Sequence, residues 1–242
     1  MKTGVVIQAR MGSTRLPGKV LQTVNGWSLL ELCATRAGRS RRAAEVVVAT
    51  STEPGDNPVA AEAARLGFPC VRGSEDDVLS RYHLAAETRG LDVVCRITAD
   101  CPFIDPEVLD AVFAVFFETG CDYASNTLRR TFPRGLDAEV FSFRALDRAH
   151  REARAASERE HVTPYICGGA PEFSLRSVER ADNLSVHRWT VDEEPDLRLI
   201  REVAARLCPR HGTRFGYRDV LAVLDREPGL ALINAHVAQK KV

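Results

Sequence analysis

Short apolar runs rich in β-branched residues alternate with longer segments of helical periodicity in the first half of the 242-residue chain. The strand-like runs cover residues 5–7, 45–50, 68–71 and 92–97. The helical segments that follow them cover residues 28–37, 57–66, 76–88 and 106–118. Strands that alternate with helices over short connections are typical of a parallel sheet covered by helices, with right-handed crossovers. We therefore predict an α/β fold whose main strands are buried on both faces.

The pattern changes after residue 121. Residues 123–134 are polar and predict a loop, while residues 138–143 and 173–178 alternate in the manner of antiparallel strands. The other elements expected are helices at 144–154, 158–166, 195–207 and 217–226 and a strand at 186–191. Because no repeat or linker divides the chain, we predict one domain over residues 1–242 with an inserted antiparallel lobe around 121–185.

The charge balance and the cysteines limit the kinds of partner, metal site and cellular compartment that the sequence favours. The 33 Lys and Arg residues balance 33 Asp and Glu residues, which argues against a protein that wraps nucleic acid or coats an anionic membrane. The seven cysteines form no C-x-x-C pair, which argues against a disulfide framework or a zinc site and favours the reducing cytoplasm. No signal peptide is recognisable, and no apolar run approaches the ~20 residues of a membrane helix. We predict a cytoplasmic protein without nucleic-acid or membrane partners.

Ligands of open α/β sheets bind beyond the carboxyl ends of the strands, which directs attention to the loop after the first strand. This loop has neither the G-x-G-x-x-G nor the P-loop pattern, but it carries the components of a phosphate cradle. Gly12 allows close backbone approach, the N–H groups of residues 11–14 can form an anion nest, and Ser13 and Thr14 add hydroxyl donors. Arg10, Arg15 and Lys19 add positive charge. The alternative is a surface loop whose cations are only solvated.

The same loop carries a resemblance to a known family. Residues 8–21, QARMGSTRLPGKVL, resemble the signature of the cytidylyltransferases that make CMP-activated acidic sugars, such as the CMP-KDO and CMP-acylneuraminate synthetases. The chain is most similar to the spore-coat-polysaccharide-F-like branch of that family. Matching segments follow in order: GSEDDVLSRY at 73–82, RITADCP at 96–102, PRGLDAEVF at 133–141, EREHVTPY at 158–165 and TVD at 190–192.

The resemblance implies a Rossmann-like, GT-A-like nucleotide-diphospho-sugar transferase fold with a mostly parallel sheet. It implies an Mg²⁺-dependent enzyme that transfers CMP from CTP to an acidic, nonulosonate-like sugar, releasing pyrophosphate, for surface polysaccharide biosynthesis. Arg10 and Lys19 would then be catalytic, as cations on a solvated loop that hold the triphosphate and stabilise the leaving pyrophosphate.

Two carboxylates are implied as Mg²⁺ ligands, Asp100 and Asp192. Each directly follows a predicted strand, so the topology selects the same two residues. Asp192 also precedes a predicted helix, and an N-cap role for it stays open as an alternative. Asp105, just before Pro106, is assigned to capping, and Cys101 is assigned to packing.

The remaining site residues divide between nucleotide and acceptor. The predicted nucleotide-binding set is Gln8, Ala9, Arg10, Met11, Gly12, Ser13, Thr14, Arg15, Lys19, Arg72 and Ser74. Arg134, Glu139 and His161 are predicted to bind the acceptor, whose carboxylate requires a cation. Arg129 and Arg130 could do the same or could simply be solvated.

Two other functions remain open at this point: a different nucleotidyltransferase or a glycosyltransferase on the same fold, and a nucleotide-binding protein without turnover. Related synthetases suggest a homodimer through the inserted lobe, where residues 138–143 and 173–178 would offer strands. The acceptor itself is not specified by the sequence.

Overall fold

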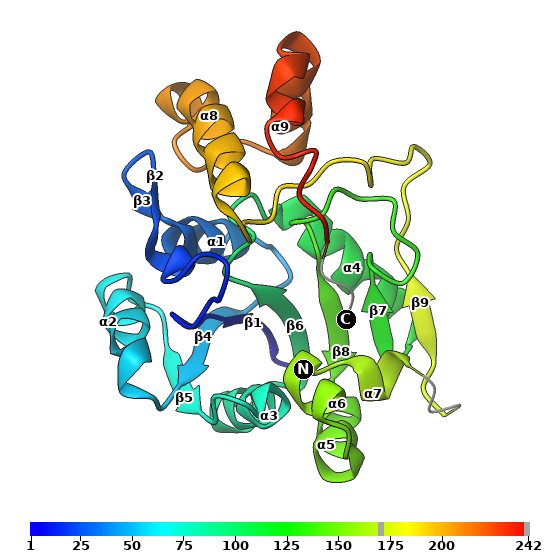
Figure 1. Ribbon diagram of the computed structural model, residues 1–242. Helices are drawn as coiled ribbons and strands as arrows, with labels where there is room; N and C mark the ends of the chain where they lie inside the picture. The colour runs from blue at the N-terminus through cyan, green and yellow to red at the C-terminus, as the bar shows by residue number, and fades with distance from the viewer. Residues whose placement is uncertain (169–171, 240–242) are drawn as a thin grey trace.

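A mixed, mainly parallel sheet forms the centre of the computed structural model, which describes residues 1–168 and 172–239 (Figure 1). Its strands are β1 (Thr3–Gln8), β4 (Glu45–Ser51), β5 (Cys70–Gly73), β6 (Val93–Thr98), β7 (Tyr123–Ser125), β8 (Glu139–Ser142) and β9 (Leu175–Ser177). Their order across the sheet is β5-β4-β1-β6-β8-β7-β9. The first four are parallel, whereas β8 runs antiparallel to both β6 and β7. The predicted α/β class is confirmed.

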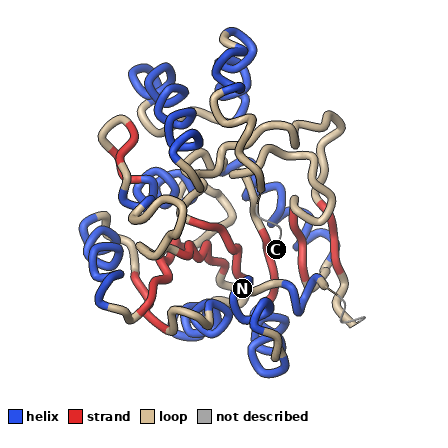
Figure 2. The backbone as a smooth tube through the Cα atoms, viewed as in Figure 1, coloured by secondary structure: helices blue, strands red, loops and turns tan. Residues whose placement is uncertain are grey.

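Helices surround the sheet, as the blue segments of Figure 2 show. They are α1 (Leu29–Ala37), α2 (Asn57–Arg65), α3 (Val78–Arg89), α4 (Pro106–Thr119), α5 (Phe143–Glu152), α6 (Ala156–His161), α7 (Pro164–Cys167), α8 (Glu194–His211) and α9 (Tyr217–Arg226). Short 3₁₀ turns lie at Lys19–Leu21 (η1), Pro54–Asp56 (η2) and Pro228–Leu232 (η3). In the described part of the chain, no helix has the length and apolar content needed to cross a membrane.

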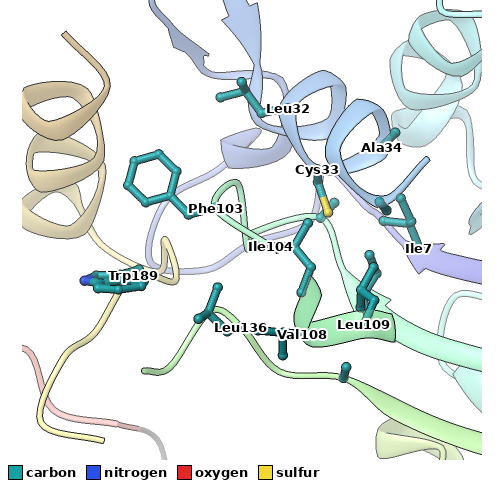
Figure 3. Packing of buried hydrophobic residues seen from close by; sticks show 14 of the residues in the cluster. Ile7, Leu32, Cys33, Ala34, Phe103, Ile104, Val108, Leu109, Leu136 and Trp189 are labelled. Carbon is teal, nitrogen blue, oxygen red and sulfur yellow. The ribbon is translucent and has the colours of Figure 1, made fainter. Parts of the chain in front are cut away.

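Alternate side chains of β1 enter two separate cores. Val5 and Ile7 pack with residues of α1, α4 and α8, part of which Figure 3 shows. Val6 packs on the other face with Tyr82 of α3 and with residues of α5. This alternation explains why β1 reads as a continuous apolar run, and it confirms the prediction of strands buried on both faces.

The structure departs from the predicted elements in several places. Residues 186–191 form no strand and make only an isolated bridge between Arg188 and Arg134, so that prediction is wrong. The apolar residues there, Trp189 and Val191, are buried by packing rather than by strand pairing. A strand, β7, lies at the start of the predicted 123–134 loop, and a small hairpin of β2 (Thr23–Val24) and β3 (Trp27–Ser28) was not predicted.

The segment predicted as an inserted lobe extends the main sheet. It contributes β7, β8 and β9, and β8 lies inside the sheet between β6 and β7. The strand predicted at 138–143 therefore has no edge to offer to a second subunit, whereas β9 is the last strand in the sheet order.

Candidate active site

A cavity of about 650 Å³ opens beyond the carboxyl ends of β1 and β6, where the topology places a ligand. Most of the predicted site residues line it: Gln8, Ala9, Arg10, Gly12, Ser13, Thr14, Arg15, Lys19, Asp100, Arg134, Glu139, His161 and Asp192. Met11, Arg72 and Ser74 do not line this cavity. The fold therefore brings predicted site residues from five distant parts of the chain into one cavity.

The loop after β1 is held in shape by its own backbone and by Asp56. Met11 donates its N–H to Asp56 Oδ1 at 2.6 Å, and its carbonyl accepts from the N–H groups of Ser13 and Gly18. The left-handed backbone conformation of this loop occurs at Gly18, with φ of 67°, and not at Gly12. Since the N–H groups of Met11 and Ser13 are already engaged, the predicted four-donor nest is reduced to the amides of Gly12 and Thr14 together with nearby side chains.

Lys19 differs most from expectation, because it is buried rather than solvated. Its Nζ donates to Asp100 Oδ2 at 2.6 Å, to Asp192 Oδ1 at 2.8 Å and to the carbonyl oxygen of Val191 at 2.7 Å. The side chain is only 11% exposed. Burial alone would lower the pKa of Lys19, but attraction to Asp100 and Asp192 outweighs it, so that the pKa is raised and the ammonium keeps its charge.

Asp192 faces cations and is not the helix cap. Burial would raise its pKa, but Lys19 above all, followed by Arg188 and Arg15, lowers the pKa to about 2. The cap of α8 involves Asp196, which is fully buried and whose Oδ2 accepts from the N–H groups of Asp192 and Glu193 at 2.9 and 3.1 Å. The alternative of an N-cap role for Asp192 is thus excluded.

The capping role predicted for Asp105 is confirmed, because its Oδ1 accepts from the N–H group of Glu107 at 2.8 Å. Its Oδ2 also accepts from the N–H group of Tyr217, which ties the start of α4 to the start of α9.

The donor atoms of Asp100 and Asp192 suit a hard divalent cation, and in this structure the ammonium of Lys19 contacts both carboxylates. Asp100 and Asp192 both contact the single nitrogen of Lys19, so their oxygens are close enough to share one cation. Among the described residues there is no cluster of three or more acidic, histidine or cysteine ligands. Two carboxylates completed by phosphate oxygens and water are the donor set that Mg²⁺ prefers.

Cations of the β7–β8 region differ in what they contact. Arg130 makes two parallel hydrogen bonds to Asp137. The side chain of Arg129 is 80% exposed and pairs with Glu179, so for Arg129 the alternative of a solvated surface cation holds. Arg134 lines the cavity and has no carboxylate within ion-pair distance in residues 1–168 and 172–239. Partial burial, and then repulsion by Arg130, lower the pKa of Arg134. An anion in the cavity would relieve both penalties.

Glu139 and His161 are positioned by internal contacts. Glu139 Oε1 accepts from the hydroxyls of Tyr123 and Thr163, both at 2.6 Å, and its Oε2 accepts from Arg96. Its carboxylate is thus engaged within the protein rather than free for an acceptor.

His161 is the last residue of α6 and is followed by Val162, which has a φ of 74°. The turn there is closed by a hydrogen bond from the Thr163 N–H group to the His161 carbonyl. Such strain in a β-branched residue concentrates at functional sites.

Comparison with known proteins identifies the family. The family model described as Cytidylyltransferase matches residues 4–202. The chain belongs to the cytidylyltransferase family. The spore coat polysaccharide biosynthesis protein SpsF of Bacillus subtilis is 32% identical over 93% of this chain and 95% of its own length, which confirms the predicted branch.

Two further similar proteins are also described as cytidylyltransferases. A structure described as a cytidylyltransferase from Leptospira borgpetersenii serovar Hardjo-bovis superposes with a TM-score of 0.91 at 31% identity, covering 100% of both chains. The 3-deoxy-manno-octulosonate cytidylyltransferase of Chlorobaculum parvum is 37% identical over 50% of this chain and 48% of its own length. The likeness to the cytidylyltransferases thus extends over the whole chain.

Several cavity residues of this cytidylyltransferase-family chain were not predicted. They are Arg81, Arg96, Thr127, Asp137, Glu160, Thr163 and Gln239. Arg81 and Arg96 stand inside segments that carry the family resemblance, which was the only signal for them. Gln239 lies beyond the part matched by the family model, and it accepts a bond from Arg188, which also holds Asp192.

Separate substitutions of Asp192 and Asp196 distinguish the roles of these two acids. We expect Asp192→Asn to lower turnover about 100-fold, because it removes charge from the site, and to cost less stability than Asp196→Asn, because Asp192 is partly exposed whereas Asp196 is fully buried. Asp196→Asn should instead cost about 3 kcal/mol of stability, because it breaks a buried ion pair with Arg188 and a helix cap. Thermal unfolding and steady-state rates measured on both variants test this. Equal losses of stability in the two variants would contradict the assignment.

Proposed function

We propose that the protein transfers CMP from CTP to an acidic, nonulosonate-like sugar and releases pyrophosphate. The observation that carries the proposal is that Asp100 and Asp192 lie together, both in contact with the Lys19 ammonium, beside the loop after β1. A nucleoside triphosphate is bound with Mg²⁺ through one or two carboxylates. The fold, the cation position and membership in the cytidylyltransferase family all support the same chemistry.

The chain supplies charge and alignment rather than a covalent nucleophile. Arg10 is exposed at the cavity and, with the hydroxyls of Ser13 and Thr14, would hold the triphosphate and stabilise the departing pyrophosphate. Mg²⁺ held by Asp100 and Asp192 would neutralise phosphate charge. Burial raises the pKa of the Cys101 thiol well above its usual range, so this neighbour of Asp100 stays protonated and serves packing.

Arg134 would bind the carboxylate of the acceptor. It is the cavity cation on the β7–β8 side that lacks an acid partner in the described residues, whereas Arg130 is neutralised by Asp137. Glu160 and His161 of α6 also line the cavity and would contact sugar hydroxyls. This division assigns the phosphates to the β1 loop and the acceptor to the β7–β8 region.

Removing Arg134 should therefore affect one substrate only. We expect Arg134→Met to raise KM for the sugar acid about 10- to 100-fold, since a charged hydrogen bond is lost, and to leave KM for CTP unchanged. Arg129→Met is the matched control, because Arg129 is exposed and pairs with Glu179 outside the cavity. Initial rates with each substrate varied in turn test this. A rise in KM for CTP alone would place Arg134 on the nucleotide.

The biological setting follows from the relatives. SpsF is named for spore coat polysaccharide biosynthesis, and we propose that the present protein also activates a sugar for a surface polysaccharide, in the cytoplasm. A homodimer is proposed through β9, the last strand in the sheet order. Light scattering of the purified protein would test the dimer, and a monomer mass would overturn it.

Product analysis tests the proposed reaction. The protein is incubated with CTP, Mg²⁺ and either keto-sugar acids or neutral sugar phosphates, and products are identified by mass spectrometry. A CMP-linked acid is expected with at least one carboxylate acceptor. Formation of a nucleoside-diphosphate sugar from a neutral sugar phosphate would overturn the proposal.

A further inference from the structure

Residues 233–239, the C-terminal segment, follow η3 and return to the active-site cavity. Figure 1 shows this part of the chain in red, running from α9 back toward the central sheet. Asn234 is buried in the segment, and a hydrogen bond from the Val237 N–H group to the Asn234 carbonyl, at 3.0 Å, closes a turn there. Gln239 follows this turn and lines the cavity. The family model matches residues 4–202, so the role of the C-terminal segment does not follow from that match.

Two side chains of the C-terminal segment hold Arg188, one at its backbone and one at its guanidinium. Asn234 Nδ2 donates to the carbonyl oxygen of Arg188 at 3.0 Å. At the other end of the same residue, Arg188 Nη1 donates to Gln239 Oε1. Residues 186–191 form only an isolated bridge and no strand, so a sheet ladder does not fix the backbone of Arg188. An arginine side chain loses much rotamer freedom when it is ordered, and these contacts from the C-terminal segment offset that cost.

The guanidinium of Arg188 lies between two carboxylates. Its Nε donates to Asp196 Oδ1 at 2.9 Å, and its Nη2 donates to Asp192 Oδ2 at 2.7 Å. Asp196 is fully buried, and Asn234 Nδ2 also donates to its Oδ1, at 2.8 Å. Asp192, in contrast, lines the cavity. Asp196 therefore anchors the arginine, and the arginine in turn orients Asp192.

The two oxygens of the Asp192 carboxylate have different partners. Its Oδ1 accepts from Lys19 Nζ at 2.8 Å, whereas its Oδ2 contacts Nη2 of Arg188 at 2.7 Å and Nη2 of Arg15 at 3.2 Å. Of the two arginines at Oδ2, Arg188 is buried and Arg15 is exposed, so Arg188 is the one that fixes the orientation of the carboxylate. Groups that orient a metal-binding carboxylate matter for the metal, and their loss typically lowers metal affinity or activity by about 10- to 100-fold.

We propose that Gln239 and Asn234 are positioning residues, which fix the carboxylate of Asp192 through Arg188. This inference rests on the proposed binding of CTP with Mg²⁺ at Asp100 and Asp192. Gln239 and Asn234 act on the arginine rather than on the reacting atoms. When Gln239 is removed, the guanidinium loses an acceptor at Nη1 and can turn, so that Asp192 Oδ2 loses a fixed partner. The C-terminal segment thus completes a site whose other residues come from earlier in the chain.

Binding of CTP to the full-length protein, measured by calorimetry with and without Mg²⁺, tests the proposal without requiring turnover. Gln239→Leu removes the acceptor of Arg188 at an exposed position, so the variant should fold. The gain in CTP affinity that Mg²⁺ provides should fall about 10-fold. Gln239→Glu keeps an acceptor for the guanidinium and should retain the gain. Gln22→Leu is the matched control, because Gln22 Oε1 accepts from Arg201 at 3.3 Å outside the cavity, and it should leave the gain unchanged.

Asn234→Ala tests the other contact of the C-terminal segment. A folded variant should lose the same part of the Mg²⁺-dependent gain and should also melt at a lower temperature, because it leaves the Arg188 carbonyl without its donor in a buried place. If this variant does not fold, the two substitutions of Gln239 decide.

Equal weakening of CTP binding with and without Mg²⁺ in Gln239→Leu would indicate a structural role and would overturn this inference alone. An unchanged gain in that variant, or a loss in Gln239→Glu as large as that in Gln239→Leu, would do the same. Absence of CTP binding to the unaltered protein, or of any gain with Mg²⁺, would overturn the proposed function and this inference with it.

Discussion

Replacing Lys19 by methionine should lower turnover about 100- to 1000-fold, the usual effect of removing one stabilising charge from a reacting centre. Lys19 is the cation that contacts both Asp100 and Asp192. The variant keeps most of the side-chain volume but leaves the two carboxylates facing each other. Steady-state rates at saturating CTP and Mg²⁺ measure the loss.

The melting temperature of the Lys19→Met variant should also depend on Mg²⁺. Because a bound cation would take the place of the missing ammonium charge, added Mg²⁺ should raise the melting temperature of Lys19→Met more than that of the unaltered protein. Lys2→Met is the matched control, since Lys2 pairs with Glu45 outside the cavity and is 43% exposed. Near-normal turnover, or an equal response to Mg²⁺ in all three proteins, would contradict the role given to Lys19.

Local sequence patterns predicted most of the fold because they are set by neighbouring residues. The apolar run of β1 and the helix that follows Pro106 need only burial and capping to be recognised. The strand expected at 186–191 failed for the same reason. Trp189 and Val191 are buried, as in a strand, but hydrogen-bonding partners are supplied by distant segments that the local pattern does not contain.

The site was predictable in composition and less so in geometry. Strand order places the ends of β1 and β6 side by side, which is why Lys19 and Asp100 could be assigned to one site. The burial of Lys19 was missed because it depends on Asp192, 173 residues further along the chain.

The rejection of UTP is the largest effect that the account predicts. Cytosine and uracil differ in the exocyclic group at position 4 and in the hydrogen on N3, so a site that pairs with one leaves buried groups unpaired with the other. Sites of this kind reject the wrong analogue by roughly 10⁴.

Pyrophosphate release with each of CTP, UTP, ATP and GTP, in the presence of Mg²⁺ and a panel of keto-sugar acids, tests the central claim most directly. We expect release with CTP and a carboxylate acceptor, at a kcat/KM roughly 10⁴-fold above that with UTP, and none above background with the purine nucleotides. Preference for UTP, GTP or ATP, or release with CTP only when a neutral sugar phosphate replaces the acid, would contradict the account.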